Sequence, residues 1–126
     1  MKKLTKAEEE IMLVLWRLNE ALVRNIIPEL EDPETPYTTV STIIRILEKK
    51  NFVSHKAYGN THLYYPLVSK KEYSRAHLKD FVSNYFNGSF SSMATFFARE
   101  SDISMEEMKE MLAELQKEVK KKSQNE

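Results

Sequence analysis

Residues 37–50 carry hydroxyl side chains and cations at helical spacing. At about 100° per residue, the aliphatic residues share one helix face: Val40, Ile43, Ile44 and Leu47. The opposite face carries Thr38, Ser41, Thr42, Arg45 and Lys49. Such groups hydrogen-bond to base edges and phosphates, so the pattern favours a helix that reads the major groove of DNA. The alternative is an ordinary amphipathic helix whose polar face meets water.

Each polar residue on the outward face of this helix has an expected role. We expect Thr39, Ser41 and Thr42 to approach base edges and Thr38 to lie at the helix cap. Arg45 and Lys49 are expected near phosphate or guanine. Ile46 also lies toward the outer side, and it is unexplained unless it touches a neighbouring element or a thymine methyl group.

The charge distribution fits this interpretation although the net charge is zero. Residues 45–79 contain eight Lys or Arg and two Glu, whereas residues 1–34 and residues 80–126 each carry three more acidic than basic residues. DNA responds to the local field of a basic band, so a neutral protein can still bind phosphates. The same band would also fit a solvated surface without a partner.

The composition excludes several kinds of site. The chain has no cysteine, which excludes disulfides and thiolate metal ligands. There is no nucleophile–base signature, phosphate-binding glycine loop or metal-ligand spacing, so we expect no enzyme activity, cofactor or metal. No apolar run reaches membrane-spanning length and the N-terminus lacks signal-peptide character. We therefore expect a cytoplasmic protein without membrane insertion.

Two helices are predicted before the reading helix. Thr5 and Glu8 form a capping box, followed by an apolar stripe of Ala7, Ile11, Val14, Leu15 and Leu18, with Trp16 beside it as a core or interface aromatic. A shorter helix is expected over residues 23–31, where Pro28 should start, shorten or kink it. Residues 31–36 contain two prolines and are predicted to form a loop.

A β-hairpin is predicted after the reading helix. Asn51 can end the helix in a left-handed conformation, and two β-prone runs flank Gly59 and Asn60. This order of elements predicts a winged helix-turn-helix, in which Lys56, Gly59 and Asn60 hold the wing to the DNA backbone. His55 and His62 are predicted to lie diagonally on one face of the hairpin. Such a pair could hold a weak metal site or bring two switchable charges near phosphate, and most simply the two are polar strand residues.

The remaining residues predict three more helices. Capping boxes begin at Ser69 and Ser104, and a short helix is expected over residues 92–100. These helices are too few to enclose a core alone, so we expect a second copy of the chain to cover their apolar residues. The expected dimerisation residues are Leu78, Phe81, Val82, Tyr85, Met108, Leu112, Leu115 and Val119. The alternative is a monomer whose helices fold back on the N-terminal part.

Five short motifs in order carry a family resemblance: LTKAE at 4–8, YTTVSTI at 37–43, LEKK at 47–50, YYPLVS at 64–69 and YFNGS at 85–89. With them the chain resembles the penicillinase-repressor (BlaI/MecI/CopY) family over nearly its whole length. The resemblance implies a homodimeric winged-helix repressor of dyad operators, often before β-lactam-resistance genes. The fold class is then mainly α with a small β-hairpin. It implies a winged-helix DNA-binding domain at 1–69 and a helical dimerisation region at 70–126.

The resemblance also implies a switch. Some family members are inactivated when a membrane-bound sensor-protease system triggers a cut between Asn and Phe in the short helix. The matching positions are Phe96 and Phe97, so the Phe is kept and the Asn is not. The copper-responsive branch is excluded because it carries a cysteine motif. Two positions depart from the pattern of that family: Asn51 stands where a Gly usually follows the reading helix, and Ile46 stands where a cation is common next to Arg45.

Three alternatives differ in their function. A winged-helix protein-interaction module would use its basic band on an acidic partner and would bind no specific DNA sequence. A repressor could also be released by a small ligand in the aromatic-rich helices rather than by proteolysis. The third alternative is an enzyme subunit, for which the sequence offers no catalytic site.

Overall fold

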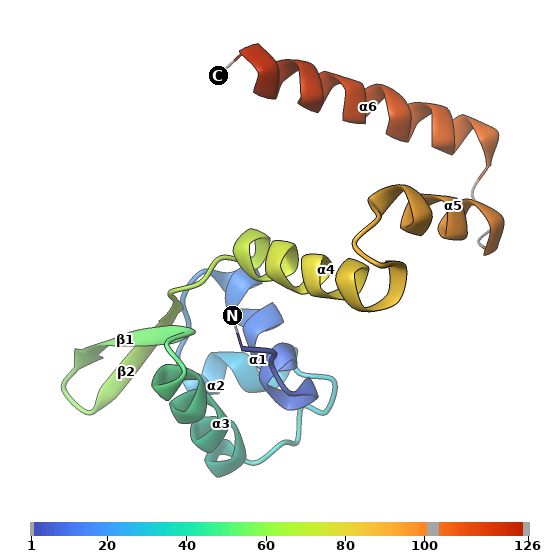
Figure 1. Cartoon of the computed structure of the whole chain (residues 1–126). Helices are drawn as coiled ribbons and strands as arrows, with labels where there is room; N and C mark the ends of the chain where they lie inside the picture. Colours follow the sequence, from blue (N-terminus) through green and yellow to red (C-terminus); the bar gives the residue numbers. More distant parts are fainter. Residues whose placement is uncertain (1, 101–103, 125–126) are drawn as a thin grey trace. The chain divides into compact units, whose positions relative to one another are not determined.

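The computed structural model describes residues 2–100 and 104–124 (Figure 1). They form helices and one two-stranded antiparallel sheet, which confirms the mainly α fold with a small hairpin. The chain divides into two compact units, Met1–Leu78 and Lys79–Glu126. The division by role expected from the sequence, 1–69 and 70–126, stays a prediction, and residues 1, 101–103 and 125–126 of it lie outside the described residues.

Helix α1 spans Lys6–Leu18 and begins with the predicted capping box. Thr5 Oγ1 accepts from the Glu8 amide at 3.2 Å, and Glu8 Oε1 accepts from the Thr5 amide at 2.8 Å. The predicted stripe is buried at Ile11, Val14 and Leu15 and half-buried at Leu18, with Met12 buried beside it. Ala7 was expected on this stripe but is exposed, and the buried side chains at this end of α1 are instead those of Leu4 and Glu8.

The predicted second helix is shorter than expected. Helix α2 covers only Val23–Ile26, and a 3₁₀ turn, η1, covers Ile27–Glu29. Pro28 explains the change, because proline has no amide hydrogen for the α-helical ladder and fits the start of a new turn.

Helix α3 spans Tyr37–Lys49 and is the predicted reading helix. Asn51 follows it with φ of 64°, as expected for a left-handed residue at a helix end. The Phe52 amide then donates to the Leu47 carbonyl at 2.9 Å, which turns the chain toward the hairpin.

The hairpin consists of β1, Val53–Tyr58, and β2, Thr61–Pro66. Tyr58 pairs with Thr61, so Gly59 and Asn60 form the predicted two-residue turn, in which Gly59 has φ of 63°. At its base, Tyr64 pairs with Ala21 through two backbone hydrogen bonds of 2.9 Å. Three helical segments followed by this hairpin make a winged helix.

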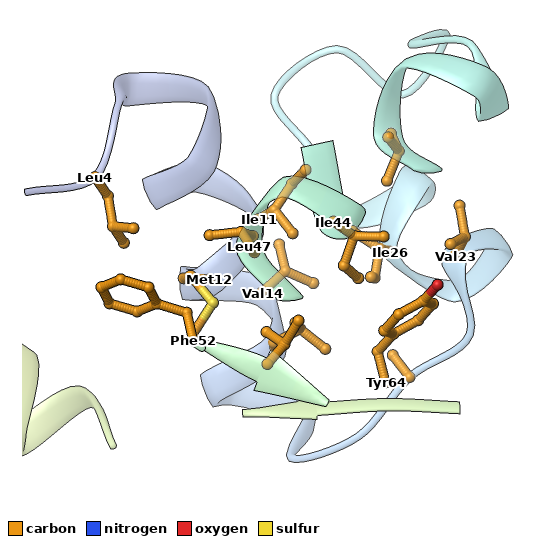
Figure 2. Close-up of a cluster of buried hydrophobic side chains, with 14 of the residues drawn as sticks. Leu4, Ile11, Met12, Val14, Val23, Ile26, Ile44, Leu47, Phe52 and Tyr64 are labelled. Atoms are coloured by element: carbon orange, nitrogen blue, oxygen red, sulfur yellow. The ribbon is translucent and has the colours of Figure 1, made fainter. Parts of the chain in front are cut away.

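A single core holds these elements together (Figure 2). Its side chains come from α1, α2, α3 and the hairpin, and include Ile11, Ile26, Ile44, Leu47 and Tyr64. Because α3 buries Val40, Ile44 and Leu47 here, its opposite face points outward.

A partly buried ion pair joins α1 to the end of α3. The Lys50 ammonium donates to both carboxylate oxygens of Glu8, at 2.9 Å and 2.8 Å. Glu8 is only 3% exposed. Burial alone would raise the pKa of Glu8, but hydrogen bonds from Lys50 and Thr5 outweigh it and leave that pKa below its ordinary value.

Three further helices follow: α4, Lys70–Phe86, α5, Phe90–Glu100, and α6, Met105–Gln124. Ser69 and Ser104 cap α4 and α6 by accepting from the amides of Glu72 and Glu107, and Ser89 caps α5 in the same way. No helix in the described ranges has the length and apolarity to span a membrane.

The beginning of α4 belongs to the first unit. The Tyr73 hydroxyl accepts from the Leu4 amide at 3.1 Å, and Trp16 Nε1 donates to the Val68 carbonyl at 2.8 Å. The Tyr73 ring also contacts Trp16 and Phe52, with ring centroids 5.8 Å and 5.9 Å apart. Trp16 is thus a half-buried packing residue, in line with its sequence-based interpretation.

We predict that Glu8→Gln lowers the free energy of unfolding by about 1–3 kcal/mol, because it leaves the Lys50 ammonium without its carboxylate. The pKa of Glu8 is lowered in the folded state, so its stabilisation is complete above the ordinary value of 4.5 and is lost as the pH falls through the lowered pKa. Urea unfolding of the wild type and of Glu8→Gln between neutral and acidic pH measures both effects.

The matched control is Arg17→Gln, which removes an ion pair with Glu29 that is exposed on both sides. It should cost less than about 1 kcal/mol. Equal losses in the two variants would contradict a structural role for the Glu8–Lys50 pair.

Candidate nucleic-acid interface

The outer face of α3 carries all the residues predicted to read DNA. Thr38, Thr39, Thr42, Arg45 and Lys49 are exposed, and Ser41 is half-buried. The Thr42 hydroxyl donates to the Thr38 carbonyl at 2.8 Å, so its methyl group and an oxygen lone pair remain for other contacts. This face can accept or donate hydrogen bonds along its length and carries two cations toward its end.

The expectation that Thr38 caps α3 is wrong. The N-cap is Pro36, without a side-chain hydrogen bond, and Thr38 lies inside the first turn. Proline suits this place because its fixed φ is compatible with helix entry. The Thr39 and Val40 amides donate to the Pro36 carbonyl, whereas no side chain caps the first turn, so the Tyr37 and Thr38 amides are the ones that can donate to an anion.

The predicted wing residues lie on the outer part of the hairpin. Lys56, Gly59 and Asn60 are all exposed. The Lys56 ammonium lies 5.6 Å from the centroid of the Tyr65 ring and 4.0 Å from a Glu20 carboxylate oxygen. An exposed pair at this distance is weak, so Lys56 stays available to phosphate.

A groove of about 370 Å³ lies between α2, α3 and the hairpin. From α3 it is lined by Tyr37, Ser41 and Arg45; from the rest of the unit it is lined by Leu22, Val23, Arg24, Asn60, Thr61, His62 and Tyr64. No carboxylate is present among these lining residues. The groove therefore offers two guanidinium groups and several neutral hydrogen-bonding groups to an anion.

Sequence reasoning missed Arg24 and Tyr37 as members of this site, whereas a place near phosphate was one of the roles considered for His62. Arg24 and Arg45 form no ion pair within the described part of the chain. Arg24 lies on a helix of four residues, too short to show a polar face, and only the folded chain brings it beside Arg45. The sequence signal that could have pointed to Arg24 is its place on the helix directly before the reading helix.

The basic band predicted from the sequence includes one lysine whose charge is neutralised in the fold. Lys50 was counted in the band, but its ammonium is held by Glu8. The outward cations near α3 are instead Arg45, Lys49 and Lys56, together with Arg24. The other cations of the band are also exposed and lie on α4: Lys70, Lys71, Arg75 and Lys79.

The two wing histidines stack as expected for a diagonal pair. The ring centroids of His55 and His62 lie 4.2 Å apart at 13°, and His55 Nδ1 is 2.5 Å from a Glu48 carboxylate oxygen. No group of three or more metal-ligating side chains occurs in the ranges described. The contact with His55 engages the carboxylate of Glu48, which lies between Arg45 and Lys49 on α3.

Tyr64 forms the buried floor of the groove. Burial raises the pKa of its hydroxyl, and the Glu48 carboxylate adds to this effect. Tyr64 therefore stays a neutral phenol at physiological pH and brings no negative charge to the groove.

The sequence profile of the penicillinase repressor family matches residues 4–117, which is most of the chain. The chain belongs to the penicillinase repressor family. Members of this family are transcriptional repressors and not enzymes, so this chain is a repressor.

Curated relatives are similar over nearly their whole length. The methicillin resistance regulatory protein MecI of Staphylococcus aureus (strain N315) is 29% identical over 110 residues, 86% of this chain and 89% of that protein. The penicillinase repressor of Bacillus licheniformis is 27% identical over 129 residues, 98% of this chain and 100% of that protein. A solution structure of the DNA binding domain of the repressor BlaI is 30% identical, covers 58% of this chain and 94% of its own, and has a TM-score of 0.49.

All but one of the dimerisation residues predicted for this repressor, which lie on α4 and α6, are exposed or half-buried in the single chain. Val82 is 1% exposed within the chain itself. Phe81 and Met108 are half-buried, whereas the others are exposed: Leu78, Tyr85, Leu112, Leu115 and Val119. The residues of the predicted switch, Phe96 and Phe97, are exposed on α5, and the Phe96 ring contacts Phe86 and Phe97.

We predict that Arg24→Gln weakens binding of this repressor to every duplex alike and reduces the slope of log affinity against log salt by about one. The reason is the loss of one phosphate-binding cation from the groove. Binding titrations at several salt concentrations measure the slope.

Arg17→Gln is the control, since it also removes one exposed arginine but from α1, outside the groove. Its slope should equal that of the wild type. The groove assignment fails if Arg24→Gln and Arg17→Gln behave alike.

Proposed function

We propose that this repressor binds a palindromic operator as a homodimer, with α3 of each protomer in the major groove. The observation that carries the proposal is the outer face of α3 beside a groove that contains Arg24 and Arg45 and no carboxylate. A dimer seated over a promoter excludes polymerase, which is repression by steric block. The protein acts in the cytoplasm, where bacterial operators are.

Within this proposal the outer residues divide into base readers and phosphate binders. Thr39, Ser41 and Thr42 approach base edges, and Arg45 and Lys49 contact phosphate or guanine. Lys56, Gly59 and Asn60 hold the hairpin to the backbone, and the groove adds Arg24 and His62. The regulated genes are of the β-lactam-resistance type or related to it, in keeping with the names of the relatives.

The dimer interface is proposed on α4 and α6. On α6, apolar residues recur at alternating steps of three and four: Met105, Met108, Leu112, Leu115 and Val119. This is heptad spacing, which lets two helices bury a common seam. The seam is largely exposed in the single chain, so a second copy is the natural cover.

Relief of repression is proposed to follow cleavage at Phe96–Phe97, triggered by a membrane sensor-protease system. The bond lies inside α5, which must unwind locally because proteases bind extended backbone. Cleavage there separates α6 and its seam from the reading helix, so each head is left to bind a half-site alone.

Selection of random duplex DNA on the purified protein, followed by sizing of the complex, tests the proposal. We expect a recovered dyad bound by two chains, with half-sites about one helical turn apart or a multiple of it. Enrichment of no sequence, with binding that vanishes at moderate salt, would instead favour a winged-helix module that binds an acidic protein partner.

The dimer is tested by Leu112→Glu, which places a charge in the α6 seam. Sedimentation should show a monomer, and affinity for the dyad should fall toward that for a single half-site. Ala113→Glu adds the same charge at the neighbouring exposed position, outside the seam, and should remain dimeric. If both variants stay dimeric, α6 is not the interface.

Cleavage is tested by limited digestion with chymotrypsin, which cuts after aromatic residues, and isolation of the species cut at Phe96–Phe97. We expect that species to be monomeric and to lose most of its operator affinity. A cut protein that is still dimeric and tightly bound would overturn the proposed switch while leaving operator binding intact.

A further inference from the structure

An apolar residue lies on the otherwise polar outer face of α3. The Ile46 side chain is 42% exposed, whereas Val40, Ile44 and Leu47 of the same helix are fully buried. Ile46 belongs neither to the core nor to the half-buried residues packed against it. A single exposed isoleucine is common on protein surfaces, so its position on the helix decides its meaning.

The outer face of α3 has two flanks that differ in chemistry. Tyr37, Ser41 and Arg45 recur every four residues and line the groove beside the hairpin. Ile46 is one step of about 100° beyond Arg45, and it follows Thr39 and Thr42 at spacings of seven and four residues. The groove flank therefore suits phosphate, whereas the side chains of Thr39, Thr42 and Ile46 form a second, uncharged flank. Lys49 follows Thr42 by seven residues and lies at the edge of this flank, toward the end of the helix.

The second flank is partly apolar at its centre. Because the Thr42 hydroxyl proton is donated to the Thr38 carbonyl at 2.8 Å, the Thr42 methyl group is free to extend the apolar surface of Ile46. In the major groove, the apolar group that a base edge presents is the C5-methyl of thymine. Any other base edge at this place would lose water from a polar atom without gaining a hydrogen bond.

We propose that Ile46, supported by the Thr42 methyl group, recognises a thymine C5-methyl group in each half-site and thereby sets the preferred operator. This inference rests on the proposed function, because it assumes that α3 lies in the major groove. It assigns specificity to a residue without hydrogen-bonding groups, on a helix whose other outer residues are polar.

The test uses the operator recovered by selection on the wild-type protein. Each thymine is replaced in turn by deoxyuridine, which removes only the methyl group. We expect one position in each half-site where the replacement weakens binding by about fourfold, the worth of one buried methylene. Elsewhere in the half-site, deoxyuridine should bind as thymine does.

Ile46→Ala should abolish this difference, so that thymine and deoxyuridine bind equally at that position. The control is Leu13→Ala, which truncates a residue of α1 that is 41% exposed and leaves the thymine preference unchanged. Thermal unfolding of both variants shows that the fold is intact, as expected for exposed side chains.

The outcomes separate this inference from the proposed function. If the wild type selects a dyad but no single methyl group affects binding, the role of Ile46 is overturned and the repressor function stands. The same holds if Ile46→Ala keeps the thymine preference. If the wild type selects no sequence at all, the proposed function and this inference fail together.

Discussion

The ion pair between the buried Glu8 carboxylate and the half-buried Lys50 ammonium is a constraint that acts together with the core to position α3. A carboxylate that is 3% exposed needs compensation, and Glu8 obtains it from the Thr5 amide at the start of α1 and from Lys50 at the end of α3. One side chain thus joins two helix ends that are 42 residues apart in the sequence. Because α3 is rigid and its inner face is packed in the core, fixing its end also fixes the direction of its outer face.

The groove shows how the fold gathers charge without a charged segment. Arg24 comes from a helix of one turn, Arg45 from the middle of α3, and His62 from the second strand of the hairpin. Each is unremarkable in its own element. The single Ala21–Tyr64 pairing brings the base of the hairpin against the α1–α2 connection, so these groups come to line one space. A neutral chain can in this way offer a concentrated positive field to a polyanion.

Local signals explain what could be predicted from the sequence. The capping residues Thr5, Ser69 and Ser104, and the Gly59–Asn60 turn, act within four residues, and all were placed correctly. The errors arise where a proline overrides a local helix signal, or where a contact joins residues that are far apart in the sequence. Pro28 divided a predicted helix into a helical turn and a 3₁₀ turn, and Pro36 took the capping place expected for Thr38. Neither the neutralisation of Lys50 by Glu8 nor the position of Arg24 beside Arg45 leaves a periodic trace, because both are contacts between elements.

The Ala21–Tyr64 pairing also has a consequence for how such repressors diverge. It is the only backbone pairing between the hairpin and the α1–α2 connection within the described residues, and beyond it toward the turn the strands pair only with each other. A change of length or sequence near Gly59 and Asn60 therefore leaves the core unaffected. Apart from Gly59, whose φ of 63° constrains the turn, selection can alter the exposed side chains of the outer hairpin without disturbing the core, so related repressors are free to acquire different wings on a common scaffold.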